Sequence, residues 1–196
     1  MSQSLIYDPV AKTLHWGTVL AIGFMLVLGG VMGEDFWPPD VRRALFTTHK
    51  TIGILILLAT FFRLYWLYRH HAPPLPVASM PRWQVWAARL THRGLYALLI
   101  VIPLSGWALV SMSGHGIQLF GLWPVPNLPL LDLVAKDGFF YTLIEESHES
   151  LAGLLVLLVG IHTGAALLHH FFERDDILLR MSPVCLGGWL NRLRRS

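Results

Sequence analysis

Long apolar runs alternate with short polar connections along the chain. Four of these runs approach the roughly 20 residues that a helix needs to cross the hydrocarbon core of a bilayer. They cover about residues 14–33, 45–68, 94–112 and 146–170. A spanning segment must satisfy its own backbone hydrogen bonds, which a helix does within one segment. The pattern therefore predicts an all-α membrane protein with four transmembrane helices.

Composition agrees with this prediction. Hydrophobic residues make up 54% of the 196 positions and charged residues only 14%, whereas soluble domains carry about 25% charged residues. The net charge of +3 comes from basic residues beside apolar segments, which indicates membrane topology and not nucleic-acid binding. We expect a single transmembrane domain over residues 1–196, in contact with membrane lipids, with a short tail from about residue 171.

The distribution of charge predicts the orientation. If successive spans alternate in direction, one side holds the N-terminus, the 69–93 connection and the C-terminal tail. That side carries 11 of the 15 basic residues and only four of the 12 acidic ones. The four basic residues on the other side are Arg42, Arg43, Lys50 and Lys136. The positive-inside rule then places both termini in the cytoplasm.

Four histidines fall at two depths along the predicted spans. His49 and His148 open the second and fourth spans on the outer side, whereas His15 and His162 lie toward the cytoplasm. The fourteen residues from His148 to His162 correspond to roughly 21 Å along a helix. Fourteen steps of about 100° leave the two side chains about 40° apart around the helix. His49 can therefore meet His148 in an outer layer, and His15 can meet His162 in an inner layer.

Two layers of paired imidazoles suit two bis-histidine haems. Neutral imidazole is a good ligand for haem iron, and helix bundles build cofactor sites from side chains on facing helices. The chain has a single cysteine, Cys185, and no C-x-x-C-H motif, so covalent c-type attachment is excluded. We expect a four-transmembrane-helix bundle that encloses two b haems, with iron ligands from His15, His49, His148 and His162.

The remaining histidines offer alternatives. His92, at the cytoplasmic end of the third span, could replace His15 as an inner ligand. His70 and His71 sit in a polar turn and are expected in solvent, and His115 lies in the outer loop. Any single intramembrane histidine could instead form a hydrogen bond between helices. Four of them at matching depths favour ligation.

Several motifs resemble those of the bacterial cytochrome b561 family. They are LHW at 14–16, HKTIG at 49–53 followed by RLYW, THRGLYALL in the third span, and GIHTGAALLHH before DDILLRM. The resemblance runs from about residue 5 to 183, and the fourth-span motif with its tail is its most specific part. It implies a di-haem, four-helix protein of the bacterial inner membrane, whose haems are held by the histidines that match His15, His49, His148 and His162.

The resemblance also implies a function. Members of the family pass electrons between the periplasmic side and the quinone pool, and at least one branch oxidises superoxide to oxygen while it reduces ubiquinone. This chain is then expected to be an oxidoreductase, with ubiquinone as substrate and a small periplasmic donor or redox protein as partner. Positive potential steers an anion such as superoxide, yet the outer side carries eight acidic residues against four basic ones. Arg42, Arg43 and Lys50 could still form a local basic funnel, or simply a solvated helix start.

Other polar residues lie near the inner layer. Arg63 in the second span could pair with a haem propionate or extend to the cytoplasmic interface. His169 follows His162 by seven residues, on the same helix face. With His170 and Arg82 it forms a candidate site for a quinone head group, because imidazole can exchange the protons that accompany quinone reduction. An ordinary interfacial histidine pair is the alternative.

Two other functions fit parts of the pattern. The chain could be the membrane cytochrome b subunit of a larger dehydrogenase or hydrogenase complex, although its small outer loops offer little docking area. It could also be a transporter that uses intramembrane histidines as a proton or metal relay. Such a relay would require carboxylates inside the spans, and none lies deep in any of them. The sequence therefore favours a membrane electron carrier.

Overall fold

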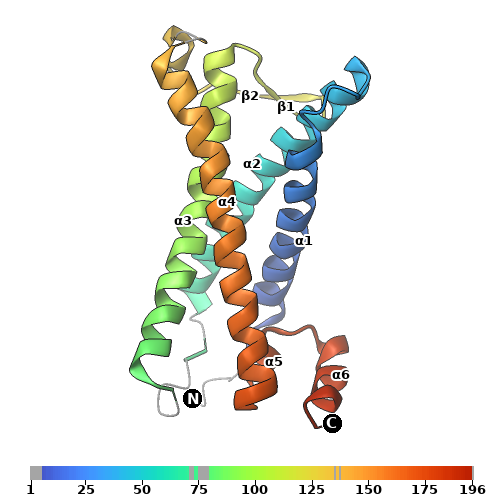
Figure 1. Ribbon diagram of the computed structural model, residues 1–196, viewed down its shortest axis with the longest axis vertical. Coiled ribbons are helices and arrows are strands. Elements are labelled where there is room, and N and C mark those ends of the chain that lie inside the picture. Colours follow the sequence, from blue (N-terminus) through green and yellow to red (C-terminus); the bar gives the residue numbers. More distant parts are fainter. Residues whose placement is uncertain (1–5, 71–72, 75–79, 135, 137, 196) are drawn as a thin grey trace.

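Four long helices form the body of the protein in the computed structural model, which describes residues 6–70, 73–74, 80–134, 136 and 138–195 (Figure 1). They are α1 (Pro9–Val31), α2 (Pro39–His70), α3 (Arg82–Ser113) and α4 (Phe139–Leu168). All four are long and apolar enough to cross a membrane. The predicted four-helix transmembrane fold is therefore confirmed.

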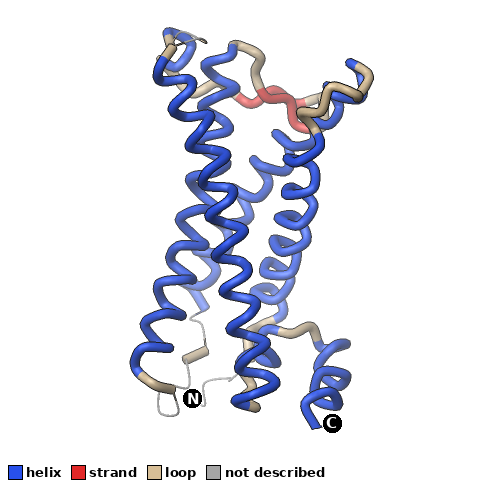
Figure 2. The backbone as a smooth tube through the Cα atoms, in the orientation of Figure 1, coloured by secondary structure: helices blue, strands red, loops and turns tan. Residues whose placement is uncertain are grey.

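Shorter elements lie at the two ends of the bundle (Figure 2). Between α3 and α4 the chain forms an antiparallel hairpin of β1 (Ile117–Leu119) and β2 (Trp123–Val125), and then a 3-10 turn, η1 (Leu131–Leu133). After α4 it continues into a π-helical turn, η2 (His169–Glu173), and two short helices, α5 (Ile177–Met181) and α6 (Val184–Arg195). The start of α1 and the end of α6 lie at one end of the bundle, called the terminus side, and the hairpin lies at the other, called the hairpin side (Figure 1).

The observed helices differ in length from the predicted spans. The second, third and fourth spans were expected to begin near residues 45, 94 and 146, but α2, α3 and α4 begin earlier, at Pro39, Arg82 and Phe139. Hydropathy detects only the part of a helix that lies in hydrocarbon, whereas the backbone remains helical through polar turns at the interface. The first span was expected to end at residue 33, and α1 ends at Val31. The hairpin is a small addition to the expected all-α fold.

The outer surface of the bundle is apolar. Large hydrophobic side chains on every long helix are solvent-exposed in the isolated chain, with relative exposures of 73% for Leu20, 57% for Leu58, 72% for Leu90 and 58% for Leu157. Soluble proteins rarely expose extended apolar surfaces of this kind, which mark contact with a membrane or with another protein. The side chains and the helix lengths together indicate a multi-pass membrane protein.

Asp8 fixes the start of α1 on the terminus side. Its carboxylate accepts a hydrogen bond from the Ala11 amide at 3.0 Å and caps the helix. The same carboxylate accepts hydrogen bonds from Trp66 Nε1 at 3.1 Å, which ties α1 to the end of α2. Burial raises the pKa of Asp8, but these hydrogen bonds outweigh it and leave the pKa below its usual value. The cap is therefore present at neutral pH and is lost when acidification protonates the carboxylate.

We expect Asp8→Ala to lower the free energy of unfolding by about 1 kcal/mol, the usual effect of removing an N-cap side chain. Thermal unfolding in detergent, followed by circular dichroism, measures the change. Asp8→Asn is the matched control, because its amide oxygen can still accept a hydrogen bond from the Ala11 amide. Equal stability of the alanine and wild-type proteins would contradict the capping role.

Candidate functional site

On the hairpin side, α2 and α4 place two imidazoles opposite each other in the bundle. The ring centroids of His49 and His148 are 6.3 Å apart, and their planes make an angle of 64°. His148 Nδ1 lies 2.8 Å from Ser105 Oγ of α3. The Ser105 hydroxyl donates its proton to the Ile102 carbonyl at 2.8 Å, so its oxygen is left to accept from His148 Nδ1–H. The proton on Nδ1 leaves the Nε2 lone pair of His148 available to a metal.

Close backbone packing and an unsatisfied nitrogen mark the surroundings of this outer pair. A Cβ atom on Gly106 would lie only 3.1 Å from Cε1 of His148, so only glycine allows α3 to approach the ring this closely. His49 Nδ1 is buried and has no hydrogen-bond partner among the described residues. An unsatisfied buried nitrogen calls for an explanation. A metal bound to this nitrogen, between the two rings, would provide one.

A second imidazole pair lies on the terminus side of the bundle. The ring centroids of His15 in α1 and His162 in α4 are 6.2 Å apart, and their planes make an angle of 69°. Arg63 of α2 places Nη2 at 3.1 Å from His15 Nδ1. The guanidinium carbon of Arg63 also lies 5.3 Å from the centre of the Tyr96 ring, in a cation–π contact. Arg63 thus points into the bundle and not out to the interface.

The separations within the two pairs fit a metal bound between imidazoles. Two metal–nitrogen bonds of about 2.0–2.1 Å, together with the distance from each nitrogen to its ring centre, require centroids roughly 6 Å apart. Both pairs meet this requirement. His92 also approaches His162, but their centroids are only 5.0 Å apart, which is too close for an intervening metal. The geometry therefore favours His15 over His92 as the partner of His162.

Both pairs share α4. His148 and His162 belong to the same uninterrupted helix, which separates the two levels by roughly 21 Å along its axis. The described parts of the chain thus bring together the four histidines in the two layers that the sequence predicts. Haem fits the donor set at each level, because two neutral imidazoles are a common ligand pair for a b-type iron.

Two of the predicted quinone residues, His169 and His170, belong to η2, beyond the inner pair. His169 is 7% exposed, and its Nδ1 lies 2.6 Å from Asp175 Oδ2 and 2.9 Å from Glu173 Oε2. His170 is fully buried, and its Nε2 lies 3.1 Å from the Leu190 carbonyl of α6. Arg82 is exposed at the first position of α3. His169 and His170 therefore have different surroundings, and His170 supports α6.

His70 and His115 have other surroundings, at the two ends of the bundle. His70 is exposed at the end of α2 and stacks on Trp66, with ring centroids 3.9 Å apart. His115 is exposed after α3, and its Nδ1 lies 3.2 Å from Ser113 Oγ. His71 lies outside the described residues.

Sequence reasoning missed the residues that orient the histidines. Ser105 gave no signal, because a lone serine in an apolar run is common in membrane helices. Asp175 and Glu173 were counted only as charges of the tail. Their contact with His169 depends on η2 and on the left-handed conformation of Arg174, which has a φ of 56°.

A membrane-spanning four-helix bundle that pairs imidazoles at two levels has the features of a membrane cytochrome b. The chain matches the family model described as prokaryotic cytochrome b561 over residues 6–183. It therefore belongs to the prokaryotic cytochrome b561 family, a family of membrane electron-transfer proteins that bind b haems.

Curated relatives agree with this assignment. Cytochrome b561 homologs 1 and 2 of Escherichia coli K12 are both 33% identical to this chain. The first alignment covers 87% of this chain and 93% of the relative, and the second covers 89% and 90%. A protein of Yersinia pestis named probable superoxide oxidase CybB is 28% identical over 92% of this chain and 98% of its own length. The chain is thus similar to these relatives over nearly its whole length.

Proposed function

We propose that this protein holds two b haems and moves electrons between a donor on the hairpin side and the ubiquinone pool. The observation that carries the proposal is the two imidazole pairs, with ring centroids 6.2 Å and 6.3 Å apart, each of which takes one histidine from the same continuous helix, α4. Haem iron changes oxidation state by one electron without proton transfer at the metal, and two such groups at successive depths provide a path across the bilayer. His15 with His162 would hold one haem, and His49 with His148 the other.

Arg63 is proposed to serve the inner haem as a counter-ion. A histidine that binds iron through Nε2 carries its proton on Nδ1 and cannot accept a hydrogen bond there. The contact between Arg63 and His15 Nδ1 would then be replaced when haem binds. The freed guanidinium is suited to pair with a propionate, because it stays charged and binds carboxylates with two parallel hydrogen bonds.

The proposed orientation places the hairpin side in the periplasm and both termini in the cytoplasm of a bacterial inner membrane. It is supported by the excess of basic residues on the terminus side. Superoxide is the first donor to test, because one relative is named a probable superoxide oxidase. Of the basic residues near this side, Arg42 is neutralised by Asp35 at 2.8 Å. Arg43 and Lys50 remain to attract an anion.

Electron delivery to quinone by the purified chain tests the proposed function. The protein is reconstituted in vesicles, supplied with superoxide, quinol or ascorbate outside, and assayed for reduction of a ubiquinone analogue. Reduction with one of these small donors supports a stand-alone oxidoreductase. Haems that are reducible by dithionite but by none of the donors would instead favour a cytochrome b subunit of a larger complex.

We also propose that His169 exchanges protons with a quinone head group on the terminus side. Asp175 and Glu173 both lie within hydrogen-bond distance of His169 Nδ1, so that nitrogen carries the proton and Nε2 remains free. The Glu173 side chain is 35% exposed and connects this cluster to water. Arg82 and His170 complete the candidate site, with His170 in a supporting position under α6.

His169→Ala is expected to slow electron exchange with a ubiquinone analogue by about tenfold or more, since a positioned proton-transfer group contributes roughly 10²–10⁴-fold. Both haems should stay bound, and their reduction by a donor on the hairpin side should be nearly unchanged. Stopped-flow absorbance measures both steps. His70→Ala is the matched control, because it removes an exposed imidazole on the same side. Unchanged quinone kinetics in His169→Ala would show that the quinone site does not include His169.

A further inference from the structure

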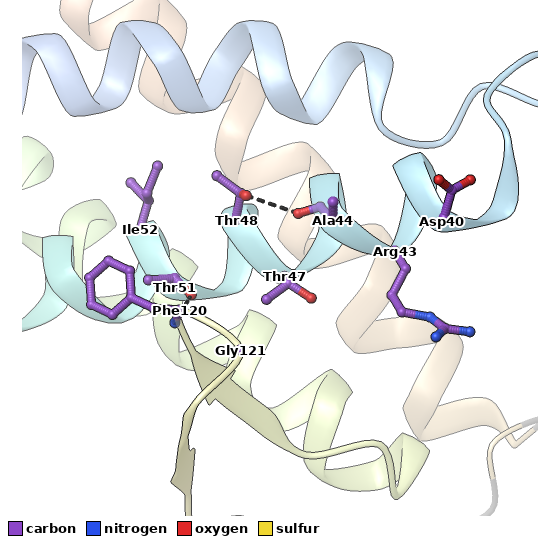
Figure 3. A pocket seen from close by; sticks show the side chains of 9 residues that line it. All are labelled: Asp40, Arg43, Ala44, Thr47, Thr48, Thr51, Ile52, Phe120 and Gly121. Atoms are coloured by element: carbon purple, nitrogen blue, oxygen red, sulfur yellow. Dashed lines mark hydrogen bonds between the residues drawn. The ribbon is translucent and has the colours of Figure 1, made fainter.

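A pocket of about 510 Å³ lies on the hairpin side, between one face of α2 and the turn that joins β1 to β2 (Figure 3). The helix contributes residues at intervals of three and four positions, from Asp40 through Ala44 and Thr47 to Thr51, so they share a single face. Phe120 and Gly121 contribute the opposite wall. The volume lies within the usual range for small-molecule sites.

An unusual backbone conformation places Phe120 over this pocket. Phe120 and Gly121 occupy the two central positions of a turn closed by the hydrogen bond from Leu122 N to Leu119 O at 3.0 Å. Both have positive φ, 54° for Phe120 and 73° for Gly121. Such turns strongly favour Asn or Gly at the first central position, and a bulky residue in this region is strained. Strained residues concentrate at ligand-binding sites.

The turn is attached directly to the pocket face of α2. The Phe120 amide donates a hydrogen bond to Thr51 Oγ1 at 3.2 Å. The Phe120 side chain is nevertheless 63% exposed, so one face of its ring is open to stacking. The backbone is therefore fixed while the aromatic surface stays available to a ligand.

The lining of the pocket combines apolar side chains with polar ones, which include the Asp40 carboxylate. Thr48 donates to the Ala44 carbonyl at 2.8 Å (Figure 3), whereas Asp40, like the two donor side chains Thr47 and Arg43, has no hydrogen-bond or ion-pair partner among the described residues. A flat ring could stack on Phe120, while its oxygens accept hydrogen bonds from these two side chains. This chemistry matches a ring that carries carbonyl oxygens.

The chain that follows the turn is apolar and exposed. Leu122 and Trp123, directly after Gly121, have exposures of 71% and 62%. Aromatic side chains such as Trp123 are typical of the membrane interface. A ligand with a hydrocarbon tail could enter from the bilayer and leave its tail among lipids, whereas a small water-soluble anion would gain nothing from these surfaces.

We propose that this pocket binds the head group of a membrane quinone, as a second ring-binding site on the side opposite His169. The inference rests on the proposed function in one respect, that the chain exchanges electrons with the quinone pool. Thr47 and Thr51 each lie two residues from His49, so the ring sits at the depth of the outer imidazole pair. About one helix diameter, roughly 10 Å, separates the pocket from that pair.

Photolabelling of the haem-loaded protein in vesicles tests this site. The probe is a short-tailed azido-ubiquinone, and mass spectrometry locates its adducts. We expect adducts within residues 40–52 or 117–125, suppressed by excess decylubiquinone. Adducts only near residues 165–175, or adducts at the pocket that decylubiquinone does not suppress, would overturn the proposal, as would a complete lack of labelling.

A cavity-filling variant sharpens the test. Ala44→Trp places an indole in the pocket and leaves the Ala44 carbonyl in place for Thr48, and labelling of the pocket should fall by about tenfold. Leu58→Trp is the matched control, because it adds the same side chain to an exposed position of α2 away from the pocket. If labelling persists in Ala44→Trp while both haem spectra are intact, quinone does not bind in this pocket, and the proposed electron-transfer function is unaffected. A wild-type preparation without b haems would instead overturn the proposed function.

Discussion

His148→Ala is expected to lose one of the two b haems and to retain the other. The variant removes an imidazole from the outer pair, and the single remaining ligand, His49, cannot form a bis-histidine site. The inner pair is roughly 21 Å away along α4, and its partner His15 lies on another helix. The reduced-minus-oxidised spectrum should therefore fall to about half its amplitude and keep a single b-type component.

His49→Ala should give the same residual spectrum as His148→Ala, because both variants remove a ligand from the same site. His115→Ala is the control, since it removes an exposed imidazole on the hairpin side. Size-exclusion chromatography in detergent establishes that each variant remains folded. Two haems in His148→Ala, or different residual spectra for the His49 and His148 variants, would refute the outer pairing.

His162→Ala is expected to lose the other haem and to leave the spectral component that His148→Ala removes. Its two neighbours provide the decisive comparison, because His15 lies at 6.2 Å and His92 at 5.0 Å between ring centroids. Only the longer separation leaves room for a metal between the rings. His15→Ala should therefore match His162→Ala.

His92→Ala should keep both haems. The Nδ1 of His92 lies 2.6 Å from the Ala88 carbonyl, which leaves Nε2 available, so the expectation rests on the 5.0 Å separation of the His92 and His162 rings. Absorption spectra of the three inner variants measure the result. If His92→Ala loses the inner haem and His15→Ala retains it, the inner ligand is His92 and not His15.

The arrangement of the histidines was predictable because it depends on helix geometry alone. The rise and the angle per residue of an α-helix place His148 and His162 on one face of the fourth span. Because successive spans alternate in direction, His49 reaches the depth of His148, and His15 reaches the depth of His162. The separation of the two ring pairs follows from this register. The helix ends were less predictable, because polar turns continue a helix beyond its apolar part, as the start of α3 at Arg82 demonstrates.

Contacts that depend on irregular backbone were beyond sequence reasoning. Asp175 reaches His169 only because η2 and the left-handed Arg174 reverse the chain. Phe120 lies over its pocket through a positive φ that Phe seldom adopts. Neither conformation follows from hydropathy or periodicity, because each is imposed by packing against a separate helix or turn.

The most direct test of the central claim is the haem content of the purified wild-type chain. A pyridine haemochrome assay on protein of known concentration counts non-covalent b haem, and dithionite reduction records its α-band. Two haems per chain, both reducible and both extracted by acid acetone, are expected from the two imidazole pairs. A colourless preparation that stays without haem after reconstitution with haemin would contradict the claim.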